Sequence, residues 1–166
     1  MILAAVLLLA VPAAQAQFAA SGTTNLTLTV GPEAALSVTE STPLTSVGTL
    51  FADFTGTTTF DYKIRTTRTG GTGSITAVVS NDFGAGGPSA AGGDLTYTCT
   101  VSTPGTGCTD TVTASTAATT NVATFGANAR SARAGNSGSV SWSLVNDPQY
   151  ETGSYTVVVA FSISAI

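Results

Sequence analysis

The side chains that most often carry out enzyme chemistry are sparse in this sequence. It contains no histidine, the commonest general base and the commonest metal ligand in proteins. The carboxylates stand singly, most of them in predicted turns or on strand faces directed to solvent, without the spacing of a paired acid and base or of a calcium loop. They are Glu33, Glu40, Asp53, Asp61, Asp82, Asp94, Asp110, Asp147 and Glu151. We therefore predict that the chain is not an enzyme and has no catalytic residue, metal site or cofactor.

The remaining polar and aromatic candidates also have structural interpretations. Lys63, Arg65 and Arg68 form a small basic group, and the parity of the first two places them on an outward strand face, where charge discourages edge pairing. Trp142 shares its parity with apolar neighbours, which favours a core position over a sugar-stacking platform. The net charge of −4 offers no electrostatic footprint for nucleic acid.

The two cysteines, Cys99 and Cys108, are separated by a segment that contains the turn pair Pro104-Gly105. An even cysteine count in an exported chain favours pairing, so we predict a disulfide that closes a hairpin.

Export is indicated by the first residues of the chain. Residues 1–16 are apolar and end in Ala14-Gln15-Ala16, the small-x-small pattern of signal peptidase substrates, which predicts a Sec-type signal peptide and cleavage before Gln17. No later run is long and apolar enough to cross a bilayer. We expect a mature chain that is secreted to the cell surface or the medium and does not span a membrane.

The elements that must position these residues are strands. Charged residues make up only 8% of the chain, and threonine and valine are frequent between glycine-rich turns, a composition typical of all-β proteins. Residues 32–166 are expected to form one immunoglobulin-like two-layer β-sandwich of nine or ten short strands. Residues 57–66 and 74–80 are expected to pair as a hairpin, and a further strand is expected at 47–54. The other expected strands are 25–30, 34–38, 95–101, 109–114, 121–125, 140–145 and a C-terminal strand in 153–166.

The two ends of the mature chain carry the clearest alternation. In the N-terminal extension, residues 17–31, Leu26, Leu28 and Val30 share one parity and the pattern stops at Gly31-Pro32, because proline cannot continue a ladder. In the C-terminal strand the shared parity is that of Tyr155, Val157, Val159, Phe161 and Ile163.

This arrangement resembles the subunits of chaperone–usher fimbriae, most closely the class 5 or alpha type. The resemblance covers the run from Asn25 through Gly31-Pro32 to Val38 and the strand that follows Gly153. It implies a filament subunit whose N-terminal strand fills a groove beside the C-terminal strand of the next copy. A periplasmic chaperone and an outer-membrane usher are the further partners that the resemblance implies.

Two other interpretations stay open at this point. Residues 26–30 can instead be the first strand of a self-complete secreted sandwich. Such a sandwich can act as a carbohydrate-binding or adhesin module, for which clustered exposed aromatic side chains are the expected signature.

Overall fold

A computed structural model of the chain describes residues 22–166. The predicted signal peptide, residues 1–16, and the cleavage point before Gln17 lie outside the described residues. The described part contains ten strands and no helix, and therefore no helix that could cross a membrane. The strands are β1 (Glu33–Val38), β2 (Thr45–Ser46), β3 (Phe54–Arg65), β4 (Gly73–Asn81), β5 (Leu95–Val101), β6 (Thr106–Gly107), β7 (Val112–Thr113), β8 (Thr120–Phe125), β9 (Asn136–Leu144) and β10 (Val158–Ala165).

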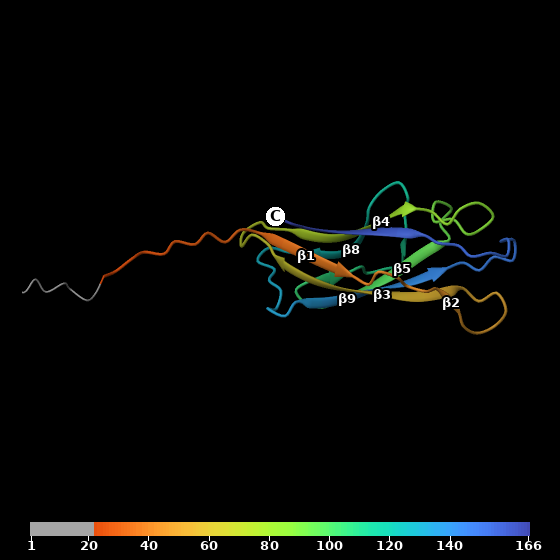
Figure 1. Cartoon of the computed structure of the whole chain (residues 1–166), viewed down its shortest axis with the longest axis horizontal. Helices are drawn as coiled ribbons and strands as arrows, with labels where there is room; N and C mark the ends of the chain where they lie inside the picture. The colour runs from red at the N-terminus through yellow and green to blue at the C-terminus, as the bar shows by residue number, and fades with distance from the viewer. Residues whose placement is uncertain (1–21) are drawn as a thin grey trace, which may run out of the picture.

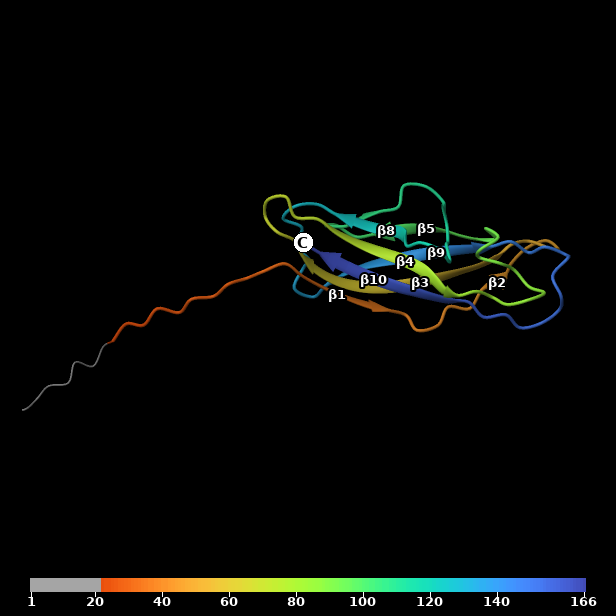
Figure 2. The same cartoon turned by 90° about the horizontal axis from the view of Figure 1, so that it is seen from above.

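The strands form two antiparallel sheets that pack as a β-sandwich, which confirms the predicted fold class (Figure 1). One sheet has the order β1-β3-β9-β5-β7, with β2 added beside β3, and the other has the order β10-β4-β8-β6. Residues 22–32 belong to neither sheet and run out from one end of the sandwich, as both views show (Figure 2).

The core forms because alternate residues of the long strands are apolar. In β3, Phe60, Tyr62 and Ile64 are almost completely buried, while Asp61 and Lys63 between them are exposed, as the period of two requires. The opposite sheet contributes the inward residues of β4 and β8, and the two inner faces interdigitate into one core.

Several sequence predictions about local structure are wrong, among them that of a strand at 109–114, where only Val112–Thr113 pairs as β7. Residues 47–53 form turns instead of the expected strand, and Val47 and Leu50 are 80% and 92% exposed. β3 and β4 are consecutive but do not pair, because the connection between them crosses from one sheet to the other. The expected hairpin of residues 57–66 and 74–80 is therefore absent.

The Cys99–Cys108 disulfide is confirmed, with the two Cα atoms 5.3 Å apart. The hairpin that it was expected to close is absent, because Cys99 lies in β5 of one sheet and β6 pairs with β8 in the other. The bond instead ties a segment that passes from sheet to sheet.

Candidate functional site

The C-terminal strand β10 forms one edge of the four-stranded sheet. It pairs with β4 on one side, and no strand among residues 22–166 pairs with its other side. An edge of this kind presents a row of backbone N–H and C=O groups to a new strand.

The side chains of β10 alternate as predicted. Val159, Phe161 and Ile163 are half-buried against the core, while Val158 on the opposite parity is 48% exposed. Tyr155 and Val157 share the inward face but precede the strand, which begins only at residue 158. The structure thus brings all five predicted side chains to one face.

The position next to β10 corresponds to a defined place in the immunoglobulin topology. In that fold strands A, B, E and D form one sheet and C, F and G the other. Here β1-β3-β9-β5 follows the order A-B-E-D, and β10 beside β4 takes the places of F and C. No strand of the described part takes the place of G.

Beside this edge the sandwich is open between its two sheets. β1, the edge of the six-stranded sheet, starts next to the end of β10 and slopes away from it along the molecule (Figure 1). Where β1 ends and β10 begins, the gap holds a groove of about 300 Å³. Its lining is mostly apolar and comprises Val38, Thr39, Glu40, Thr42, Leu44, Thr58, Leu95, Trp142, Val157, Val159 and Phe161.

Trp142 belongs to the floor of the groove. Its side chain is only 6% exposed, and its Nε1–H donates a hydrogen bond of 2.8 Å to Oγ1 of the buried Thr58. The Thr58 hydroxyl also bonds to that of Thr42 at 2.7 Å. These bonds fix the indole within the core, as its parity predicted, and leave little of its face for stacking on a sugar.

The N-terminal extension lies outside the sandwich with its apolar residues uncovered. The exposed fractions are 93% for Leu26, 83% for Leu28 and 57% for Val30. Residues 25–30, predicted as a strand, pair with no strand of the described part.

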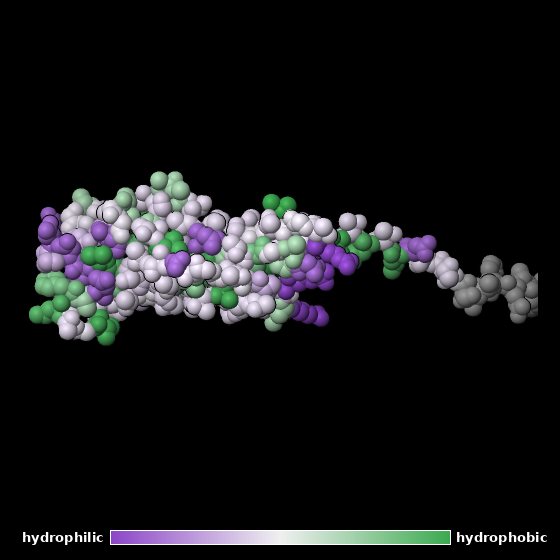
Figure 3. All heavy atoms as spheres, turned by 180° about the vertical axis from the view of Figure 1, so that it is seen from behind, coloured by the Kyte–Doolittle hydropathy of each residue, from purple (hydrophilic) through white to green (hydrophobic). Residues whose placement is uncertain are grey.

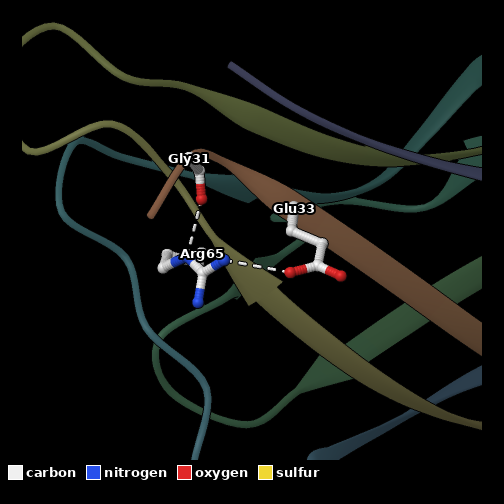
Figure 4. Close-up of polar contacts among 3 residues, drawn as sticks. All are labelled: Gly31, Glu33 and Arg65. Carbon is white, nitrogen blue, oxygen red and sulfur yellow. Dashed lines mark hydrogen bonds and ion pairs between the residues drawn. The ribbon is translucent and has the colours of Figure 1, made fainter. Parts of the chain in front are cut away.

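The base of this extension is fixed by one side chain (Figure 4). Arg65 Nε donates a hydrogen bond of 2.7 Å to the carbonyl oxygen of Gly31, and its Nη2 forms an ion pair of 2.9 Å with Glu33. Arg65 thus sets the point at which the extension leaves the body.

Asp82 stabilises the connection between β4 and β5. Asp82 accepts hydrogen bonds from the backbone N–H groups of Phe83, Ala90 and Ala91 and from the Ser89 hydroxyl. Burial alone would raise the pKa of Asp82, but these bonds outweigh it and lower the pKa below its ordinary value. Within residues 22–166 no group of three or more metal-binding side chains comes together.

The sequence predicted the strand side of the site and missed the opposite wall. Val38, Leu44 and Leu95 come from different segments: Val38 and Leu95 look like ordinary core residues of β1 and β5, and Leu44 lies in the connection between β1 and β2. Only their meeting at the open end of the sandwich makes them part of a groove.

Comparison with protein-family models, with curated proteins and with solved structures gives no match for this chain.

Proposed function

We propose that this chain is a secreted structural subunit of a surface filament that assembles by donor-strand exchange. The observation that carries the proposal is the open outer edge of β10 beside an apolar groove, at the place where an immunoglobulin-like sandwich has its seventh strand. The donor is the N-terminal extension of another copy.

The extension has the pattern that this site needs. A strand added to a sheet edge gains affinity from main-chain hydrogen bonds and specificity from alternate side chains that enter pockets. Leu26, Leu28 and Val30 are alternate, apolar and exposed in the isolated chain. Burying each is worth about 1.5–3 kcal/mol, and each main-chain hydrogen bond adds about 0.5–1.5 kcal/mol.

The direction of the extension favours another copy over the chain's own groove. Arg65 holds the Gly31 carbonyl at the start of β1, and from there the extension points away from the body (Figure 2). Reaching its own groove would require the chain to reverse at Gly31-Pro32. A head-to-tail contact between different surfaces does not close on itself, so repetition gives a filament.

Two further partners are proposed from the resemblance to chaperone–usher subunits, and the open edge is compatible with them. An apolar, unpaired edge is an aggregation hazard before assembly. The resemblance supplies a periplasmic chaperone that occupies the groove and an outer-membrane usher that exchanges it for the next extension, and both are part of the proposal. The buried Trp142 counts against the alternative of a carbohydrate-binding module.

The test is an SDS gel of material sheared from the producing organism, run without and with boiling. A ladder of subunit multiples that collapses on boiling is expected for trapped strand contacts. Leu28→Asp should abolish the ladder, whereas Thr27→Asp, which adds the same charge on the opposite parity, should keep it. A monomer band in the unboiled wild-type sample, or equal ladders from both variants, would refute the proposal.

A further inference from the structure

The charges of this chain are separated along its long axis. All five lysine and arginine residues lie at or near the end from which the extension leaves: Lys63, Arg65, Arg68, Arg130 and Arg133. Arg130 and Arg133 lie in the β8–β9 connection, which passes beside the end of β3. The backbones of Arg130 and Arg65 form an isolated β-bridge, and the Ser131 N–H donates a hydrogen bond of 2.9 Å to the Ile64 carbonyl. Glu33 and Asp61 are the two acidic side chains in this region of the described part, and Glu33 is paired with Arg65. We call this end the basic pole.

The opposite end, which we call the acidic pole, carries carboxylates and no lysine or arginine among the described residues. They lie in the connections β2–β3, β4–β5 and β9–β10 and are Asp53, Asp82, Asp94, Asp147 and Glu151. Figure 3 shows hydrophilic residues gathered at both ends of the molecule and a body of nearly neutral hydropathy between them.

The acidic pole is held in shape by bonds between its loops. The Glu151 N–H donates to the Gly86 carbonyl at 2.8 Å, and the Asn146 side chain donates to the Ala52 carbonyl at 3.0 Å. The pKa of Tyr150 reflects the negative charge at this pole. Partial burial and the nearby Asp94, Asp147 and Asp53 carboxylates raise its pKa to about 12.

The two poles are too far apart to neutralise each other. β3 alone has 12 residues, which corresponds to a length of about 40 Å. The Debye length at physiological ionic strength is about 8 Å, so each pole acts on what lies directly in front of it.

We infer that the acidic pole of one copy docks on the basic pole of the next copy in the filament. The occupant is a second copy of this chain because the two ends are complementary in charge. The docking rests on the proposed strand exchange for its direction: the extension leaves at the basic pole, and the groove runs from the end of β1, beside the middle of β3, to Leu95 near the acidic pole. An extension that enters the groove from the Leu95 end and lies antiparallel to β10 therefore brings these two ends together.

An apolar tip belongs to the same contact surface. Leu50 and Phe51 are 92% and 61% exposed in the β2–β3 connection at the acidic pole. The turn that carries them is fixed, because the Ala52 N–H donates to the Thr49 carbonyl at 3.1 Å and the Ser46 hydroxyl to the Ala52 carbonyl at 2.6 Å. Exposed apolar groups on a rigid turn are typical of an interaction surface.

The first test measures assembly rate against salt concentration. For the wild type, raising salt from about 0.01 M to about 1 M, which shortens the Debye length from about 30 Å to about 3 Å, should slow assembly about tenfold or more. Asp53→Lys with Glu151→Lys, and separately Arg68→Glu with Arg133→Glu, should assemble slowly at low salt and lose the salt dependence. The variant that combines all four substitutions should recover both the fast assembly at low salt and the salt dependence. Asp110→Lys, in the β6–β7 connection between the poles, is the control and should behave as the wild type.

The second test does not depend on stable strand exchange. Lys63 is the single lysine of the chain, so a carbodiimide that joins carboxylates to amines reports which carboxylates approach it. In linear dimers we expect Lys63 linked to peptides of the acidic pole, chiefly those with Asp53 or Glu151.

The outcomes separate the two proposals. A boil-sensitive ladder whose only Lys63 links are to the neighbouring Glu33 and Asp61 would overturn the docking and keep the strand exchange. Links to the acidic pole without any ladder would overturn the strand exchange and keep the docking. Equal salt dependence in the wild type and both pole variants would also overturn the docking.

Discussion

Replacing Asp82 by asparagine should destabilise the chain by about 2–3 kcal/mol near neutral pH. Oδ1 accepts from the N–H groups of Phe83 and Ala90 at 2.9 and 2.8 Å, and Oδ2 from the Ala91 N–H and the Ser89 hydroxyl, both at 3.1 Å. An amide in place of Oδ2 turns a donor toward the Ala91 N–H and removes the charge from the two remaining bonds. A hydrogen bond to a charged group is worth about 1.5–3 kcal/mol and a neutral one about 0.5–1.5 kcal/mol, which gives the stated range.

The effect should depend on pH with a defined sign. Because the pKa of Asp82 is lowered in the folded state, its contribution to stability is complete above the unfolded pKa of about 3.9 and is lost as pH falls through the folded pKa. The wild type and Asp82→Asn should therefore converge in stability as the solution is acidified below about pH 4.

The assay is urea unfolding followed by the fluorescence of Trp142, the single tryptophan of the chain, which lies in the core. The corresponding fall in Tm is about 4–12 °C. Asp110→Asn is the matched control, because that exposed carboxylate accepts one hydroxyl bond, from Thr109. Wild-type stability in Asp82→Asn at neutral pH, or a constant difference from neutral to acid pH, would refute the reasoning.

Two further changes test how the core and the crossing segment are held. Thr58→Val should cost about 1–3 kcal/mol, because it leaves the buried Nε1–H of Trp142 without an acceptor, whereas Thr57→Val on the exposed face should change stability little; urea midpoints compare them. Replacing Cys99 and Cys108 by serine should cost about 2.5–3 kcal/mol by the loop-entropy estimate, and a calorimetric Tm equal to that of the oxidised wild type would contradict it.

The long strands could be predicted from the sequence because one face of each is buried. In β3 the alternation of Phe60, Tyr62 and Ile64 with polar residues indicates a strand with one face in the core and the other in solvent, whichever strands pair with it. Residues 47–53 contain as many apolar residues as a strand, and the prediction failed there because nothing covers them: Phe51 takes a positive φ of 60° in a turn.

Which strands pair could not be predicted from periodicity. Alternation places a residue inward but does not say which sheet supplies the strand, so β3 and β4 looked like a hairpin while they lie in different sheets. The disulfide shows the same limit. The sequence predicted the Cys99–Cys108 bond, and only the sheet assignment showed that it spans a crossover.

The separation of charge was hidden for a related reason. Lys63 and Arg65 are adjacent in the strand pattern, but Arg130 and Arg133 are more than sixty positions away and join them only because the β8–β9 connection returns to the end of β3. A net charge of −4 describes none of this.

The edges of the described sheets argue that the open side of β10 is there to be used. Natural sheets protect their edges with short strands, charged residues, proline or bulges. β6 and β7 follow this rule with two residues each, whereas β10 has eight residues, no charged residue or proline among them, and a register irregularity only at its first two residues, Val158 and Val159. With so little protection along most of its length, such a strand favours pairing with another strand. The extension matches it in periodicity, and in the proposed assembly the opposite charges at the two poles restrict its approach to the head-to-tail direction. The open edge of β10 thus selects a partner strand by its alternation, and the poles select it by the charge of the end from which it leaves. A partner strand that lacks either the alternation or the charged end should compete poorly for the groove.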